Sequence, residues 1–269
     1  MPDPPLRLRH RDMLRALDEI DLLGVVAQEL VRRANGTDRP RAGVVVAPDA
    51  TTVQDRRTGR VCLLPTPSLH MIGMAALATL TVRELLTPAV VTASVFGEGP
   101  AARLHLSLIA RHIPNFSCAS VHPANLLVIA ELGWARLDLG HLHPGMVIIN
   151  ATRRDLPEEL LDEVDRVYVD DIGLLEHNQH RTFVRWHLAG SGGPPDSRHR
   201  PPGGHRGPVA RWRYERRIDT DLGHVLAGGR GRPDADDVIL VELFNGGSPT
   251  ACLAARICQA AIALGIDHQ

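Results

Sequence analysis

Residues 90–114 read VVTASVFGEGPAARLHLSLIARHIP, and this stretch decides the fold. An apolar run predicts a buried strand over 90–96, and Gly97 and Gly99 then form a turn. Apolar side chains at helical spacing follow and predict an amphipathic helix to about residue 112. A buried strand that passes through a glycine turn into a helix is the opening unit of a Rossmann-type sheet.

Four further apolar runs extend this sheet. They are ANLLVIAE (124–131), GMVIINA (145–151), DRVYVDD (165–171) and DVILVELF (237–244). The segment LPEELLDEV (156–164) predicts a helix between the second and the third of them. Strands that are apolar throughout and alternate with helices indicate a parallel sheet, so the predicted fold class is α/β.

The first part of the chain predicts a second, α+β unit. Residues 10–34 have helical periodicity with Asp21 as an N-cap, residues 43–64 have the β-branched runs of paired strands, and residues 70–86 predict an alanine-rich helix. Residues 189–208 are dominated by Gly, Pro, Ser, His and Arg. Such a composition cannot form a core element, so we expect a flexible loop there.

Composition favours small-molecule partners. The chain has 269 residues, of which 44% are hydrophobic, and its 30 basic residues balance 31 acidic ones. This charge lacks the electrostatic signature of a nucleic-acid binder or of a polybasic membrane patch. All the basic residues are arginine, so no lysine can form a Schiff base or act as a general base.

Signals for metal sites, disulfides and export are missing from the sequence. The cysteines are far apart without CxxC spacing, and His177 and His180 have no further ligands at matching spacing, so we expect neither a disulfide framework nor a metal site. The N-terminus has no apolar signal segment, and no apolar run reaches the about 18 residues of a membrane span. We expect a cytoplasmic protein with no membrane or nucleic-acid partner.

The glycine turn is the strongest candidate binding site. Gly97, Glu98, Gly99, Pro100 and Ala102 belong to a GxGxxA pattern between a strand and a helix. Glycines let the backbone approach a pyrophosphate, and the helix N-terminus offers free N–H groups and a positive potential. The pattern predicts binding of NAD or NADP, and a tight turn without a ligand is the alternative.

The ribose-binding part of such a site is incomplete. The acidic residue expected about 20 residues after the turn is missing, because the next short strand ends in Ser120, Val121 and His122. The segment between the helix that ends near residue 112 and the strand at 124–131 also has too few residues for a complete adenine pocket. We therefore expect a shortened nucleotide half, with His122 near the ribose and NADP favoured over NAD.

Asp155 is the first candidate catalytic residue. It follows the strand at 145–151, and open α/β sheets bind their ligands beyond the carboxyl ends of the strands. The alternative is an N-cap of the helix that begins near Leu156.

Segments along most of the chain, in the right order, match one family. They are HMIGMAALATLTVRELL, the turn VFGEGPAARLHLSLIARHIP, ANLLVIAE, HLHPGMVIINATRRDLPEELLDEVDRVYVDD, and DLGHVLAGGRGRPDADDVILVELFNGG with the closing helix LAARICQAAIALGI. In these segments the chain resembles the ornithine cyclodeaminase and mu-crystallin family. The resemblance spans roughly residues 10–269, with gaps.

The resemblance implies a two-domain subunit and a reaction class. Residues 1–88 and 225–269 would form the substrate and dimerisation domain of a homodimer, and residues 89–224 would form a shortened Rossmann-type domain. The implied activity is NAD(P)-dependent hydride transfer at a C=N or C–N bond of a specialised biosynthetic substrate, by imine or ketimine reduction or by amine oxidation. The alternative is a cofactor-independent relative that catalyses a non-redox cyclisation or binds a biosynthetic intermediate.

The same resemblance also implies which residues of this chain form the site. It implies Gly97, Gly99 and Ala102 for the phosphate turn, Ala130 and Glu131 for the strand end near the nicotinamide, Asn150 and Ala151 for the turn in the cleft, and Asp155 near the family's catalytic aspartate.

Three departures from the family pattern concern the substrate side. The family's substrate-binding arginine falls at about His70, its active-site lysine has no counterpart, and the acidic residue early in the closing helix appears as Cys252. In the family these groups would hold a substrate carboxylate and handle the proton of the amine. We therefore expect His70 or Asp155 to supply the proton, and a substrate other than ornithine or alanine.

Overall fold

A computed structural model gives the fold of most of the chain. Two predictions fall largely or wholly on residues that it does not describe, namely His122 and the loop at 189–208. Of that loop, Ala189 and Gly190 instead end the helix α6 (Thr182–Gly190). The described residues are 4–37, 43–55, 58–86, 90–118, 124–131, 140, 142–152, 154–190, 218–229 and 231–266.

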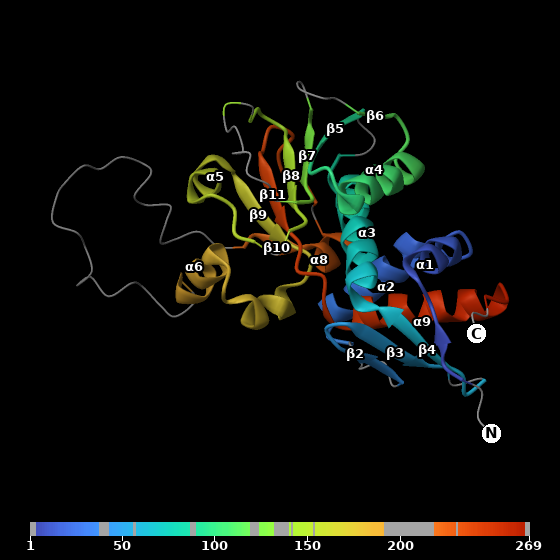
Figure 1. Cartoon of the computed structure of the whole chain (residues 1–269). Coiled ribbons are helices and arrows are strands. Elements are labelled where there is room, and N and C mark those ends of the chain that lie inside the picture. Colours follow the sequence, from blue (N-terminus) through green and yellow to red (C-terminus); the bar gives the residue numbers. More distant parts are fainter. Residues whose placement is uncertain are drawn as a thin grey trace, which may run out of the picture.

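A seven-stranded sheet, parallel throughout, forms one half of the molecule (Figure 1). This confirms the predicted Rossmann-type α/β fold. β7, β8 and β11 are buried at every position, as their unbroken apolar sequences require. In spatial order the strands are β10 (Thr220–Asp221), β9 (Arg166–Val169), β11 (Ile239–Glu242), β8 (Val147–Asn150), β7 (Leu126–Ile129), β5 (Val91–Phe96) and β6 (Phe116–Cys118).

The strand order reverses at β5. From β5 the chain passes to β6 on one side and then to β7 on the other. Ligands of open α/β sheets bind at such a reversal, beyond the carboxyl ends of the strands. β6 is the edge strand, and within the described part of the chain no further strand lies beyond it; the shortening of this half stays a prediction.

Helices pack on both faces of this sheet. Along β8, Val147 and Ile149 pack into the core that contains α3 (Thr66–Leu86), whereas Ile148 packs into a second core with α5 (Glu158–Glu163) and α6. α4 (Pro100–His112) packs on α3. A 3₁₀ helix (Ile172–Asn178) and α8 (Leu222–Leu226) complete this part of the chain.

A mixed sheet of four strands forms the other half. Its order is β1-β4-β3-β2; β1 runs parallel to β4, and the other pairs are antiparallel, which confirms the predicted paired strands. The strands are β1 (Leu6–Arg7), β4 (Val61–Pro65), β3 (Ala50–Gln54) and β2 (Val44–Val46).

Helices from both ends of the chain pack beside this sheet. The expected helical segment at 10–34 is two helices, α1 (His10–Leu17) and α2 (Leu22–Ala34), and the Asp21 side chain caps α2 by accepting from the Gly24 N–H at 2.9 Å. The C-terminal helix α9 (Gly247–Ala263) contacts α1, α2, α3, β2 and β3. The division at residues 88 and 224 stays a prediction, and β11, which follows residue 224, is a strand of the parallel sheet.

The helix α3 lies between the two sheets (Figure 1). It begins at Thr66, four residues before the predicted start, and is long and apolar enough to span a membrane by length and composition. The predicted absence of such a run is wrong by length and composition. Because 78% of its apolar window is buried against the rest of the protein, α3 is a core helix.

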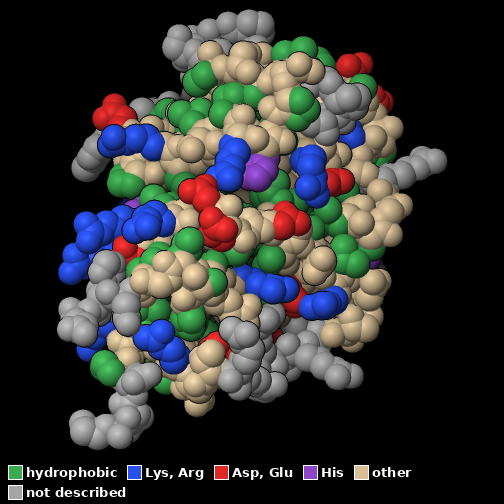
Figure 2. Space-filling view, turned by 90° about the vertical axis from the view of Figure 1, so that its right-hand side faces the viewer, with side chains coloured by type: hydrophobic (Ala, Val, Ile, Leu, Met, Phe, Trp, Pro, Cys, Tyr) green, Lys and Arg blue, Asp and Glu red, His purple; other side chains and the backbone are tan. Residues whose placement is uncertain are grey.

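The surface has charges of both signs. On the face beside α1 and α4, arginine and acidic side chains are interspersed with apolar ones (Figure 2). This mixture agrees with the near-neutral composition.

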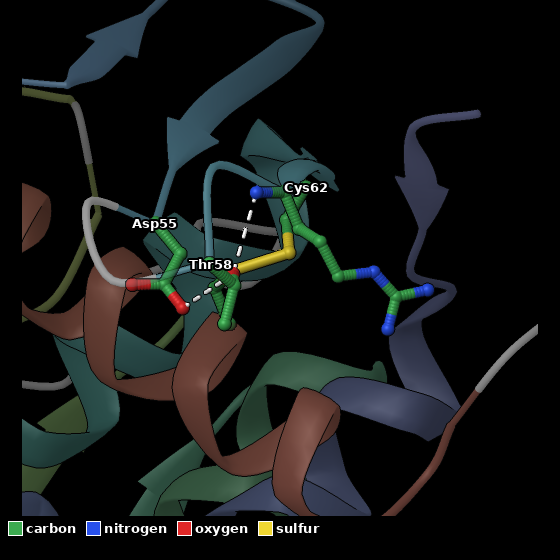
Figure 3. Close-up of a disulfide and its surroundings, with 5 residues drawn as sticks. Asp55, Thr58 and Cys62 are labelled. Carbon is green, nitrogen blue, oxygen red and sulfur yellow. Dashed lines mark hydrogen bonds between the residues drawn. A yellow bond between two sulfur atoms is a disulfide. The ribbon is translucent and has the colours of Figure 1, made fainter. Parts of the chain in front are cut away.

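A disulfide links β4 to the C-terminal helix α9, so the prediction of no disulfide is wrong. Cys62 on β4 bonds to Cys258 on α9 across 196 residues, and both cysteines are fully buried. Beside Cys62, Thr58 Oγ1 donates to the Asp55 carboxylate at 2.9 Å in the β3–β4 turn (Figure 3). Sequence spacing could not reveal this pair, because the fold alone brings β4 and α9 together.

Replacing Cys258 with alanine should lower the free energy of unfolding by about 2–4 kcal/mol, because a long loop is no longer closed in the unfolded chain. Denaturant unfolding without reductant measures this, and Cys118→Ala, at an exposed free cysteine, is the control. Equal stability of the Cys258 variant and the wild type would contradict the disulfide.

Candidate functional site

One pocket opens where the two halves of the molecule meet. It has a volume of about 200 Å³ and lies between α3, the first turns of α4 and the carboxyl ends of β8 and β11. Among the predicted site residues, His70 and Ala151 line it. Its lining consists of Pro67, His70, Met71, Met74, Ala101, His105, Ala151, Phe244 and Asn245.

The glycine turn lies next to this pocket. Gly97 has φ +136°, a conformation that favours glycine, and Gly99 is the N-cap of α4. Gly99 has no side chain to cap α4, and within the described residues the first N–H groups of this helix are left for water or a ligand. Ala102 packs beside Gly97, where a Cβ on the glycine would lie 3.5 Å from the alanine methyl.

Glu131 lies directly against the glycine turn. The N–H groups of Ala130 and Glu131 both donate to the Phe96 carbonyl, at 3.0 and 3.2 Å, so the ends of β7 and β5 are held together. A Cβ on Gly99 would clash with Oε1 of Glu131, and a Cβ on Gly97 would lie 3.2 Å from its Cβ. The structure therefore brings the predicted residues of the turn and of the β7 end together, with a carboxylate at the turn.

Asn245 joins the loop after β11 to α3. Its Nδ2 donates to the His70 carbonyl at 2.7 Å, and its Oδ1 accepts from Thr250 Oγ1 at 3.2 Å. A Cβ on Gly73 would lie only 2.6 Å from Asn245 Oδ1, so this contact requires glycine. Sequence reasoning missed Asn245; the Asn-Gly-Gly run directly after a buried strand was the available signal.

Asp170 holds the same loop from the end of β9. Its carboxylate accepts from the N–H groups of Phe244 and Asn245, at 3.0 and 2.7 Å. The side chain is buried, and burial raises its pKa to about 7, although the two backbone hydrogen bonds act in the opposite direction. Asp170 is therefore a buried carboxylate that fixes one wall of the pocket.

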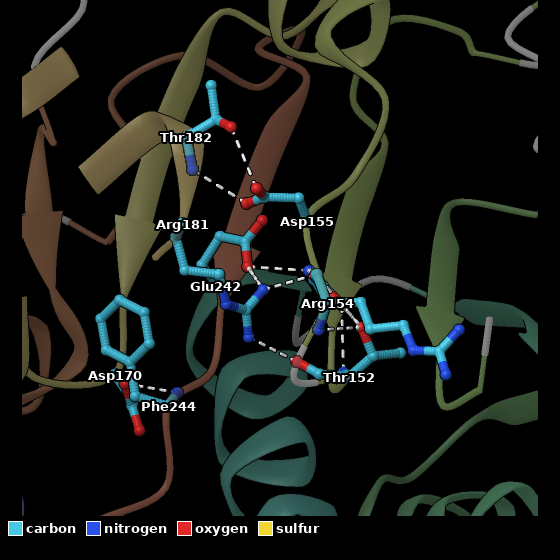
Figure 4. Close-up of polar contacts among 9 residues, drawn as sticks. Thr152, Arg154, Asp155, Asp170, Arg181, Thr182, Glu242 and Phe244 are labelled. Atoms are coloured by element: carbon cyan, nitrogen blue, oxygen red, sulfur yellow. Dashed lines mark hydrogen bonds and ion pairs between the residues drawn. The ribbon is translucent and has the colours of Figure 1, made fainter. Parts of the chain in front are cut away.

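A buried polar network fixes the loop after β8 (Figure 4). Asn150 Nδ2 donates to Glu242 at 2.8 Å, and Asn150 Oδ1 accepts from Thr152. Arg181 donates to Glu242 at 3.0 Å and to the carbonyls of Thr152 and Arg154 at 2.6 Å. Burial raises the pKa of Glu242 to about 8, and the Arg181 guanidinium opposes this shift. The structure thus gives Asn150 a positioning role outside the pocket lining.

The Asp155 carboxylate is hydrogen-bonded to the start of α6. It accepts from the N–H and the hydroxyl of Thr182, both at 2.9 Å (Figure 4). The alternative role as the cap of α5 is wrong, because Pro157 is the N-cap of that helix. Asp155 is exposed and does not line the pocket. Cys252 on α9 is buried and does not line the pocket either.

His105 is a second polar pocket residue that sequence reasoning missed. It is 1% exposed, lines the pocket, and has no hydrogen-bond partner for Nδ1 among the described residues. Burial lowers its pKa to about 4. The signal was its place on the apolar stripe of α4, where Ala102, Leu108 and Ile109 are also buried.

Metal ligands do not gather in the described part of the chain. No three His, Cys, Asp or Glu side chains there lie close enough together to hold an ion.

The chain is similar to known proteins in its fold. Neither protein-family models nor curated proteins match the sequence. The structure of CmnK has a TM-score of 0.70 at 18% identity and covers 98% of this chain and 97% of its own. A probable ornithine cyclodeaminase from Bordetella pertussis Tohama I has a TM-score of 0.66 at 16% identity, covering 98% of this chain and 99% of its own.

A third structure extends this likeness. The Δ1-pyrroline-2-carboxylate reductase of Thermococcus litoralis, in complex with NADH and L-proline, has a TM-score of 0.66 at 13% identity. It covers 98% of this chain and 99% of its own. At the level of the fold, these structures confirm the resemblance to ornithine cyclodeaminases predicted from the sequence.

Replacing Asp170 with asparagine should flatten the pH dependence of stability. Its pKa rises from an ordinary 3.8 to about 7 on folding, so between these values the folded state keeps a proton that the unfolded state loses. The free energy of unfolding therefore falls as pH rises through this window, and the variant lacks this contribution. Unfolding at a series of pH values measures the slope, with the exposed Glu159→Gln as control. An unchanged slope would show that Asp170 is ionised throughout.

Proposed function

We propose that the chain is an ornithine cyclodeaminase-like, NAD(P)-dependent oxidoreductase that acts on a C=N or C–N bond. The observation that carries this proposal is the position of the pocket, whose wall includes Ala101 in the first turn of α4, directly after the glycine turn. A cofactor on the turn and a small substrate in the pocket would then be neighbours. The fold shared with a reductase described in complex with NADH supports the same assignment.

The glycine turn fits the pyrophosphate of a dinucleotide once one side chain moves. Gly97 has a positive φ that favours glycine, a Cβ on Gly99 would meet only the movable Glu131 carboxylate, and the start of α4 supplies N–H groups and a positive potential. The Glu131 carboxylate lies against the turn, where it would repel a phosphate. Because Glu131 is exposed, its side chain can rotate away into solvent.

The bound cofactor would supply hydride chemistry, and the chain's own residues would orient the substrate and handle its proton. His70 Nδ1 lies 3.5 Å from Asn245 Nδ2. Because the amide nitrogen is a donor, the neutral ring would accept at Nδ1 and carry its proton on Nε2, and the protonated ring would be the form that gives a proton to the substrate. We favour His70 over Asp155 as the proton donor, since His70 lines the pocket and Asp155 is bonded to Thr182.

A second candidate function is a cofactor-independent cyclase or binding protein with the same pocket. The Glu131 carboxylate at the turn favours this function, because it occupies the approach to the phosphate position. A titration with a reduced dinucleotide separates the two candidates.

Replacing Glu131 with glutamine should tighten NADH and NADPH binding about tenfold, because a like charge is removed from the phosphate position. Titration followed by nicotinamide fluorescence measures the dissociation constants. Glu163→Gln, with the same charge change on α5, should bind like the wild type. If neither the wild type nor the Glu131 variant binds at millimolar concentration, the turn has no cofactor and the second candidate stands.

We also propose a homodimer formed through β2. β2 is an edge strand of the mixed sheet, and Val45 and Val46 on it are 65% and 44% exposed. An open edge with apolar side chains favours pairing with a second copy.

Val45→Asp should shift the protein towards monomer in sedimentation velocity, because it buries a charge in that interface. Ile172→Asp, at another exposed apolar position, is the control. A dimer unaffected by the Val45 change would place the interface elsewhere.

A further inference from the structure

His105 lines the pocket and has a ring nitrogen that is unpaired within the described part of the chain. The residue is 1% exposed, and the unpaired atom is Nδ1. Buried polar atoms are nearly always hydrogen-bonded, because an unpaired one loses its bonds to water without replacement. A buried and unpaired nitrogen beside a cavity points to a ligand that completes it.

The pocket matches a small, mainly apolar compound. Its volume of about 200 Å³ equals that of about seven water molecules in the liquid. Met71, Met74 and Phe244 are among its lining residues. These side chains suit the hydrocarbon part of a ligand, which leaves its polar atom to the few polar groups of the lining.

The Asn245 amide is already engaged within the protein. Its Nδ2 donates to the His70 carbonyl at 2.7 Å, and its Oδ1 accepts from Thr250 at 3.2 Å. These contacts fix the amide in place. Among the described lining residues, this leaves two side chains that can hydrogen-bond a ligand: His70, to which the proposed function gives the proton, and His105.

The charge state of His105 narrows the class of ligand. Burial lowers its pKa to about 4, so the ring is neutral at physiological pH. A neutral imidazole offers one N–H and one lone pair, and the N–H can donate to a carbonyl oxygen or an imine nitrogen. It does not supply the positive charge that a buried carboxylate requires.

We propose that His105 hydrogen-bonds the C=N or C=O group of the substrate, and that this substrate is a small, uncharged, largely apolar compound rather than an amino acid. The proposal rests on the proposed function for the reacting bond. Binding to His105 itself requires no cofactor, so it is tested without one.

Two matched probes test the class of ligand. 2-Pyrrolidone has a five-membered ring with a neutral C=O group, and L-proline has the same ring size with a carboxylate. Protein labelled with ¹⁵N at histidine is titrated with each probe, and the ring resonances of His105 are followed by NMR. We expect 2-pyrrolidone to shift these resonances and L-proline to bind about tenfold more weakly.

A substitution separates a ligand role from a structural one. His105→Leu removes an unpaired polar group from a buried position, so it should raise the Tm of the free protein and weaken 2-pyrrolidone binding about tenfold or more. His112→Leu makes the same change outside the pocket on α4 and should leave 2-pyrrolidone binding unchanged.

Three results would overturn the proposal. They are equal or tighter binding of L-proline, no binding of 2-pyrrolidone to the wild type at millimolar concentration, and a lower Tm with unchanged binding in His105→Leu. Each is independent of dinucleotide binding, so failure of this proposal differs from failure of the proposed function.

Discussion

The hydrogen bonds of Asn245 connect the parallel sheet to the central helix α3. Asn245 has φ +51°, which costs on the order of 1 kcal/mol for a residue other than glycine. Three contacts compensate for it: Nδ2 to the His70 carbonyl, Oδ1 from Thr250, and the backbone N–H to Asp170. Because His70 and Phe244 are positioned by these contacts, the shape of the pocket depends on this junction.

The direction of the parallel strands places the chemistry at one edge of the sheet. All strands of this sheet end on the same side, so residues far apart in sequence meet there. The positions concerned are Gly97 after β5, Glu131 after β7, Ala151 after β8, Asp170 after β9 and Asn245 after β11. α3 and α4 lie beside this edge and add His70 and His105, so the row of strand ends becomes one side of a pocket.

The sequence predicts local structure well and long-range contacts poorly. The strand at 90–96, the glycine turn and the following helix are predictable because each depends on neighbouring residues. The Cys62–Cys258 disulfide and the bonds of Asp155 to Thr182 join distant segments, and periodicity carries no information on such pairs. His105 was missed because a histidine on the apolar face of a helix resembles an ordinary core position.

The central claim is that the turn at Gly97 and the pocket beside α4 form one site for a cofactor and a substrate. A crystal structure with NADH tests it most directly. The account predicts the pyrophosphate at the start of α4, with Glu131 rotated away from Gly99. A turn that stays empty at saturating NADH, with Glu131 still against Gly99, would contradict it.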